Sequence, residues 1–141
     1  MKNIMKSVFF VFFMAGGTVA SDTVVENKPE NDSIIVYYFH STSRCVSCIK
    51  IEKWSYDAIT DSFPDAMKEG KLVWRPTNID KQENKRFIKE YTLFTNTLIV
   101  TEIKKGKQVR WKNPDKVWQF LRDQEQFSAY VTQEIRSYLA E

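Results

Sequence analysis

Residues 34–48 read IIVYYFHSTSRCVSC, and this stretch decides the fold. Its first six residues are β-branched or aromatic without a polar interruption, which is typical of a strand covered on both faces. A polar loop over residues 40–44 leads to Cys45 and Cys48, and from Cys45 onward apolar residues recur at helical spacing. The stretch therefore predicts a buried strand, a short loop and a helix that carries two thiols in its first turn.

The chain beyond this stretch continues to alternate between helical and extended patterns. We predict a helix from residue 45 to Pro64, a strand over 71–79, a short helix over 80–91, strands over 97–101 and 108–111, and helices over 113–121 and 127–139. Pro76 predicts that the far end of the second strand lies at a sheet edge or bends away, because proline has no N–H to donate to a neighbouring strand. The order of elements predicts an α/β domain whose central four-stranded mixed sheet is flanked by helices.

The overall composition is that of one globular domain. The 141 residues are 43% hydrophobic and 28% charged, which excludes a disordered chain and a bundle of membrane helices. Lysines and arginines are interleaved with acidic residues along the domain, so nucleic acid is not an expected partner.

The first twenty residues resemble an export signal. Lys2 and Lys6 flank a polar start, residues 8–15 are apolar, and Thr18 and Ala20 are small residues before a cleavage point. The apolar run is shorter than the roughly 20 residues that span a bilayer, although an uncleaved anchor remains the alternative. We expect a signal peptide over 1–20, a flexible linker over 21–32 and a domain over 33–141. We expect this domain in the periplasm or on the outer face of the inner membrane, touching the membrane only through an uncleaved leader.

Two thiols at this spacing have a chemical reason to open a helix. The unpaired N–H groups and the positive end of the helix dipole stabilise a thiolate on the first cysteine. That thiolate attacks a disulfide, and the second thiol, one turn along, resolves the mixed disulfide. We therefore predict Cys45 as the nucleophile and Cys48 as the resolving thiol, with Arg44 adding positive charge beside Cys45.

Three other interpretations of the two cysteines remain open. A structural disulfide is one, although closing so small a loop stabilises a fold by roughly 2 kcal/mol, against about 3 for a fifteen-residue loop. Metal binding is another, but His40 is the only histidine of the chain, so two thiolates would hold Cu(I) or a thiophilic metalloid rather than zinc. Inert buried thiols are the third. His40 itself is either a packing residue or an accessory residue of the site.

Several further segments resemble the thioredoxin superfamily over roughly residues 33–140. They are the apolar strand, the Cys45–Cys48 motif, Asn78-Ile79-Asp80, Tyr91, Thr97-Leu98-Ile99-Val100 and the hairpin at Gly106. More narrowly, Tyr38-Phe39-His40, Arg44-Cys45, Cys48-Ile49-Lys50-Ile51-Glu52, Arg110-Trp111-Lys112-Asn113 and Asp115-Lys116-Val117-Trp118 resemble the bacterial ArsF family. That family is described as a nitrophenyl-compound nitroreductase subunit and is linked to arsenic-resistance gene sets. The resemblance implies a thioredoxin-like fold and redox work without a bound cofactor.

Two positions depart from the thioredoxin pattern. Asn96 stands where thioredoxin-like enzymes carry a cis-proline facing the dithiol, and a non-proline cis bond costs about 3 kcal/mol, so we expect a trans bond there. Tyr37 and Tyr38 occupy the region of the strand that holds a buried acid in thioredoxins. Our hypothesis is an exported thiol–disulfide oxidoreductase or redox carrier, acting on envelope protein disulfides or on one redox partner. The alternatives are a soft-metal or arsenite-binding protein and a non-catalytic subunit of a reductase.

Overall fold

Four strands form one mixed sheet in the order β2-β1-β3-β4. The computed structural model describes residues 32–140, so the predicted signal peptide and nearly all of the predicted linker lie outside it. The strands are β1 (Ser33–His40), β2 (Leu72–Asn78), β3 (Thr97–Lys104) and β4 (Lys107–Lys112). Strand β1 runs parallel to β2 and antiparallel to β3, and β3 pairs antiparallel with β4. The predicted four-stranded mixed sheet is confirmed.

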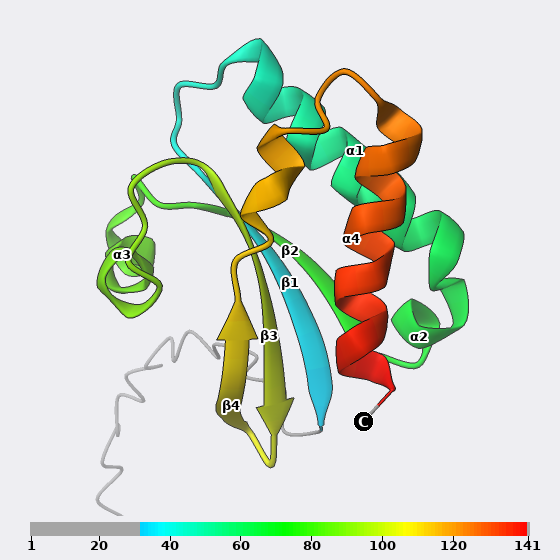
Figure 1. Ribbon diagram of the computed structural model, residues 1–141. Coiled ribbons are helices and arrows are strands. Elements are labelled where there is room, and N and C mark those ends of the chain that lie inside the picture. Colours follow the sequence, from blue (N-terminus) through cyan, green and yellow to red (C-terminus); the bar gives the residue numbers. More distant parts are fainter. Residues whose placement is uncertain (1–31, 141) are drawn as a thin grey trace, which may run out of the picture.

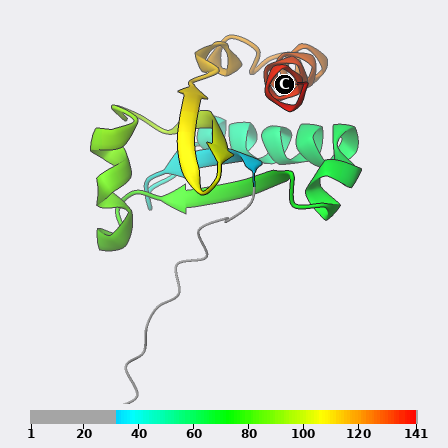
Figure 2. The ribbon, with the colours of Figure 1, turned by 90° about the horizontal axis from the view of Figure 1, so that it is seen from below.

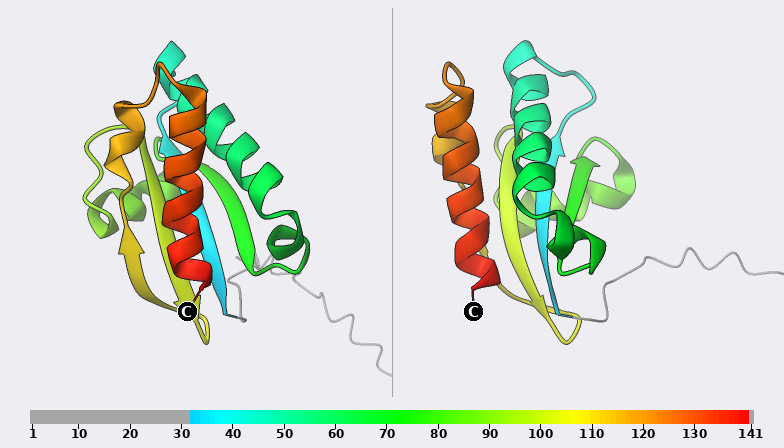
Figure 3. Two further views of the ribbon diagram at one scale, coloured as in Figure 1. Left: turned by 45° about the vertical axis from the view of Figure 1, so that its right-hand side comes forward. Right: turned by 90° about the vertical axis from the view of Figure 1, so that its right-hand side faces the viewer.

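Helices cover both faces of this sheet (Figures 1 and 3). One face carries α1 (Val46–Ser62), α2 (Pro64–Lys68) and α4 (Gln124–Leu139), and the other carries the short helix α3 (Lys85–Glu90). Seen from below, α4 is viewed end-on and lies farther from the sheet than α1 (Figure 2). Two predicted helices are shorter than expected. In the helix predicted over 80–91, residues 82–84 form a 3₁₀ turn before α3, and in the helix predicted over 113–121 only a 3₁₀ turn over 115–118 is present. The second turn is closed by bonds between residues three apart, including Phe120 N–H to Val117 C=O at 3.3 Å.

Strand β1 is the centre of the fold because it is buried on both faces. Val36 and Tyr38 point to the side of α1 and α4, and Tyr37 and Phe39 point to the side of α3. All four are at most 6% exposed. The unbroken apolar run that predicted this strand is therefore the consequence of two separate cores, one on each side of the sheet.

The two cores differ in kind. On the α1 and α4 side the core is mainly aliphatic, with Ile51 and Ile59 of α1 against Val131 and Ile135 of α4. The α3 side is an aromatic cluster, in which Tyr37, Phe39, Phe87 and Tyr91 lie with ring centroids 5.0–6.0 Å apart. Such ring contacts add roughly 0.5–1.5 kcal/mol each beyond area burial, which allows one short helix to cover this face.

Both edge strands carry features that disfavour pairing with another chain. Strand β2 is an edge strand and contains Pro76, as predicted. In β4 the register shifts, because Glu102 pairs with Arg110 while Ile103 pairs with Gln108. Val109 is thus the extra residue of a β-bulge, a device that twists sheet edges.

A buried carboxylate joins β3 to β4 beside this bulge. The side chain of Glu102 is 6% exposed and contacts Lys104 Nζ at 2.9 Å and Arg110 Nε at 2.5 Å. The hydrogen bond from Lys104, with that from Arg110, lowers the pKa of Glu102 against the opposing effect of burial. The Arg110 guanidinium also lies 4.2 Å from the ring centroid of Tyr138, so this carboxylate links the hairpin to α4.

Glu102→Gln should lower the free energy of unfolding by about 1–2 kcal/mol at pH 7, because it removes a buried charge paired with two cations. The pKa is lower in the folded state, so this stabilisation is present above the unfolded-state pKa and is lost as pH falls through the folded-state value. Urea unfolding of the oxidised protein at pH 7 and pH 3 measures both values. Glu69→Gln, which breaks an exposed pair with Lys71, is the control and should change stability by less than about 0.5 kcal/mol. Equal losses from Glu102→Gln at both pH values would contradict the assignment.

Candidate functional site

The two cysteines form a disulfide at the start of α1. Cys45 is the N-cap residue, with φ −80° and ψ 163°, and its Sγ accepts a hydrogen bond of 3.1 Å from the backbone N–H of Cys48. The Cα atoms of the pair are 5.0 Å apart, within the usual range for a disulfide. Cys45 is exposed, whereas Cys48 is only 6% exposed. An attacking partner therefore has access to Cys45, as the predicted division of roles requires.

The start of α1 favours negative charge on Cys45. A helix N-terminus presents unpaired N–H groups and a positive dipole end. The first turn of α1 carries no acidic side chain that would neutralise that field. When the disulfide is reduced, the N–H of Cys48 that now bonds Sγ of Cys45 is in place to stabilise its thiolate.

Tyr38 connects the central strand to the disulfide. Its ring is fully buried, and its hydroxyl donates a 2.7 Å hydrogen bond to the carbonyl oxygen of Cys48. Burial raises the pKa of Tyr38 to about 12, so the hydroxyl stays protonated and keeps donating at neutral pH. The strand region that lacks an acid thus supplies a neutral donor that holds the carbonyl of Cys48.

Arg44 forms an ion pair with Glu52, which lies one helical turn after Cys48 on α1. The two side chains are 27% and 23% exposed, so the pair is largely shielded from water. The guanidinium predicted to add positive charge beside Cys45 is therefore shared with a carboxylate. The sequence did not lead us to assign a role to Glu52, although its spacing of four residues from Cys48 indicates that the two side chains are neighbours on the helix.

The other two accessory residues differ in their relation to the disulfide. Asn96 is 8% exposed, and its Oδ1 accepts a 3.1 Å hydrogen bond from the backbone N–H of Ser41, in the loop before Cys45. Every peptide bond in residues 32–140 is trans, as expected for Asn96. His40 donates from Nδ1 to the carbonyl of Ser41 at 2.9 Å and stacks on Tyr38. Its ring does not line the hollow beside the disulfide.

That hollow, which we call the loop-side hollow, has a volume of about 410 Å³. Its lining includes both cysteines, the polar residues Ser41 and Asn96, and the apolar residues Leu93 and Phe94. Phe94 is 92% exposed, so its ring forms an open apolar wall close to the disulfide. The arrangement suits an extended segment of a partner protein better than a small enclosed ligand.

Asp80 holds the loop that leads into this site. Its Oδ2 accepts a 2.7 Å hydrogen bond from the backbone N–H of Thr42, and that bond is the main reason why the pKa of Asp80 is lowered. Together with Asn96, Asp80 fixes two successive amides of the loop between β1 and Cys45.

Three solved thioredoxin structures are similar to this chain at low sequence identity. No family-wide sequence profile matches the chain, and no curated protein matches its sequence. Among solved structures, Fasciola hepatica thioredoxin is similar, with 19% identity over 66% of this chain and 82% of that one, at a TM-score of 0.41. A Thermus thermophilus thioredoxin is 15% identical, with 64% of this chain and 72% of that chain covered, at a TM-score of 0.35. The reduced Schistosoma mansoni thioredoxin pre-protein is 18% identical, with 67% of this chain and 80% of that chain covered, also at a TM-score of 0.35.

The strand order and strand directions are those of a thioredoxin-like fold. This assignment rests on the chain's own strand order and directions, with helices on both faces and the Cys45–Cys48 pair where the first helix begins. In the part of the chain that the structure describes, no helix is both long and apolar enough to cross a bilayer. Nor do residues 32–140 bring together three or more histidine, cysteine, aspartate or glutamate side chains as metal ligands.

The segment from α3 to β3 that forms the wall of the loop-side hollow begins in a strained conformation. Thr92 has φ 51°, in the left-handed region that β-branched residues rarely adopt. It ends α3, where the N–H of Tyr91 bonds Phe87 C=O and that of Leu93 bonds Ile88 C=O. Glycine is the usual residue at such a helix end.

Thr92→Gly should therefore raise the free energy of unfolding by about 1 kcal/mol, because relief of the strain outweighs the added freedom of the unfolded chain. Urea unfolding of the oxidised protein measures the change. Thr95→Gly makes the same substitution nearby at a residue without positive φ and should destabilise the protein. A loss of stability in Thr92→Gly would show that the conformation is not strained.

Proposed function

We propose that this protein is a thiol–disulfide oxidoreductase or redox carrier that works through Cys45 and Cys48 with a specific partner. The observation that carries the proposal is an exposed N-cap cysteine in a disulfide with a buried cysteine one turn later. A purely structural disulfide has no need for that asymmetry. Closing such a short loop also adds little stability to a domain with two cores.

The exchange has two steps. In the reductase direction, the Cys45 thiolate attacks a partner disulfide, forms a Cys45–partner disulfide and releases one partner thiolate, which takes up a proton. The Cys48 thiol then loses its proton and attacks Sγ of Cys45, which releases the second partner thiol and forms the Cys45–Cys48 disulfide. The partner gains two electrons and two protons, and a dithiol reductant protein must restore the pair. Disulfide donation is the same sequence in reverse.

The loop-side hollow supports a specialised partner rather than many. Asn96, with a trans peptide bond and its Oδ1 committed to the Ser41 amide, replaces the proline expected beside the dithiol. The nearly fully exposed ring of Phe94 supplies an apolar contact on the same side. A partner segment must match both features, so we infer one preferred redox partner in the cell envelope.

The location and the narrower kinship belong to the same proposal. The apolar run at residues 8–15 supports export, and an exported dithiol meets the disulfides of envelope proteins. The segments around the cysteines and the Arg110-Trp111-Lys112-Asn113 motif support kinship with the ArsF family. A role as the redox subunit of a larger reductase is compatible with both.

Cys48→Ser should trap the first step. After reduction, the purified variant should form a stable mixed disulfide with oxidised glutathione at Cys45, because the resolving thiol is absent. The matched variant Cys45→Ser leaves only the buried thiol and should react at least about tenfold more slowly. Intact-protein mass spectrometry over time measures both reactions.

The same variants separate exchange from metal binding. Equal, slow reaction of both variants with glutathione would contradict the exchange mechanism. Tight binding of one arsenite per reduced wild-type protein, together with that slow exchange, would favour the metalloid-binding alternative, since it needs both thiolates.

A further inference from the structure

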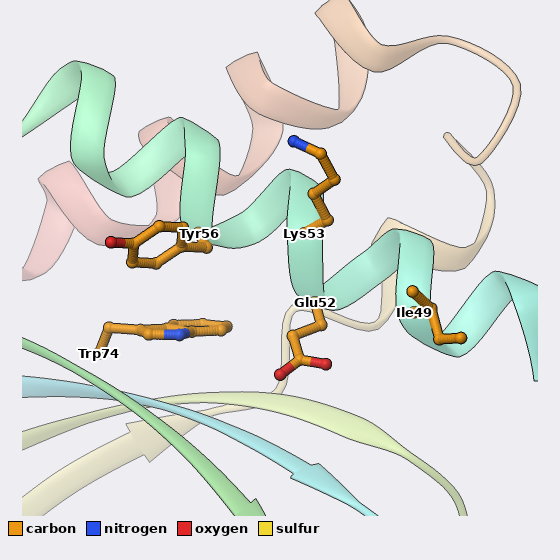
Figure 4. Close-up of a pocket in the computed structure, with 5 residues that line it drawn as sticks. All are labelled: Ile49, Glu52, Lys53, Tyr56 and Trp74. Atoms are coloured by element: carbon orange, nitrogen blue, oxygen red, sulfur yellow. The ribbon is translucent and has the colours of Figure 1, made fainter. Parts of the chain in front are cut away.

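Two opposite charges flank the dithiol and are paired with each other. Arg44 directly precedes Cys45, and Glu52 lies four residues after Cys48, where side chains on a helix are neighbours about 5–6 Å apart at Cβ. Figure 4 shows Glu52 pointing from α1 toward the sheet, near the indole of Trp74. It lines a second hollow of about 330 Å³, the strand-side hollow, with Ile49, Lys53, Tyr56 and Trp74.

A second ion pair on the same helix has a different setting. Lys53 and Asp57 are 2.5 Å apart, but Lys53 is 69% exposed and points away from the sheet in Figure 4. Solvent-exposed pairs are screened by water and have little effect at a distance. The Asp57 side chain is 31% exposed, close to the 23% of Glu52, but its cation is the more exposed one and it lies nine residues after Cys48 instead of four. The chain thus provides on α1 a second paired carboxylate that lies more than two helical turns from the dithiol.

The two charges of the shielded pair act on the dithiol in opposite senses. A nearby cation stabilises a thiolate and lowers its pKa, and a nearby carboxylate does the reverse. Tyr38, whose hydroxyl bonds the carbonyl of Cys48, already responds to both: Arg44 lowers its pKa and Glu52 raises it, beneath the larger effect of burial. Both charges therefore reach the group that contacts the resolving cysteine.

Other polar groups near the dithiol leave this balance in place. From β1, Tyr38 stays neutral and His40 is bound to the Ser41 carbonyl. From the segment after β2, Asp80 is bound to the Thr42 amide, with Lys85 and His40 acting on it. On α1, Lys50 donates a 3.0 Å hydrogen bond to the Leu121 carbonyl and lies 4.6 Å from the ring centroid of Trp54. Arg44, just before α1, and Glu52, on α1, are thus the ion-paired charges on either side of the motif.

We propose that Glu52 is a positioning residue that sets the redox potential of the Cys45–Cys48 pair. Its carboxylate offsets the Arg44 guanidinium and disfavours the thiolates, so the disulfide is less oxidising than Arg44 alone would make it. The proposal rests on the exchange function proposed above and names the residue that adjusts it. A disulfide is a strong oxidant when its reduced form is stabilised as a thiolate, and the Glu52 carboxylate acts against that stabilisation.

Glu52→Gln should shift the equilibrium with reduced and oxidised glutathione toward the reduced protein by about three- to tenfold, where tenfold corresponds to about 30 mV. The pH at which Cys45 is half-alkylated should fall in the same variant. Glu52→Asp keeps the charge and should restore the wild-type equilibrium. Asp57→Asn removes a paired carboxylate of similar burial that lies more than two helical turns from the dithiol, and it should leave the equilibrium within twofold of the wild type.

An equilibrium within twofold of the wild type in Glu52→Gln, or an equal shift in Asp57→Asn, would overturn the proposal. A shift that Glu52→Asp fails to reverse would assign Glu52 a packing role instead. Equilibration with glutathione needs no partner protein, so the result is independent of mixed-disulfide trapping by Cys48→Ser. If Cys48→Ser fails to trap a mixed disulfide but Glu52→Gln shifts the equilibrium, only the proposed function is refuted. If Cys48→Ser traps a mixed disulfide but Glu52→Gln leaves the equilibrium unchanged, only the role of Glu52 is refuted.

Discussion

Strand β1 must be buried on both faces, and the rest of the structure depends on that constraint. It pairs with β2 on one side and β3 on the other, so its carboxyl end lies at the centre of the sheet. The loop that follows is held by Asn96 from the start of β3 and by Asp80 from the segment after β2. Cys45, an exposed residue, can therefore occupy the N-cap of α1 in one defined position, with its Sγ hydrogen-bonded to the Cys48 amide.

The chemistry of the site follows from which groups around the disulfide are charged and which are neutral. The helix end and Arg44 favour a thiolate, whereas Glu52 opposes it. Tyr38, protonated at neutral pH, holds the carbonyl of Cys48 without adding charge. A buried acid at that place on the strand would be one more negative charge. Its replacement by tyrosine leaves the balance to the pair Arg44 and Glu52, of which Glu52 lines the strand-side hollow.

Local pattern was enough to predict the strands and the position of the dithiol. The run from Ile34 to Phe39 is short, β-branched and aromatic, which is typical of a strand covered on both faces, and helical spacing begins at Cys45. The 3₁₀ turns at 82–84 and 115–118 were missed because periodicity does not report the shift from four-residue to three-residue bonds. The pairing of Arg44 with Glu52 and the contact of Asn96 with Ser41 depend on how the loop folds back, which spacing alone does not specify.

The N-cap position should activate Cys45, and the pH dependence of Cys45 alkylation in the reduced protein tests this activation. Iodoacetamide labelling, followed at Cys45 by peptide mass spectrometry, gives the pKa of this thiol separately from that of Cys48. We expect a pKa at least about one unit below the ordinary 8.5 of a free cysteine. A pKa of about 8.5 or higher would show that the helix end and Arg44 do not stabilise the thiolate.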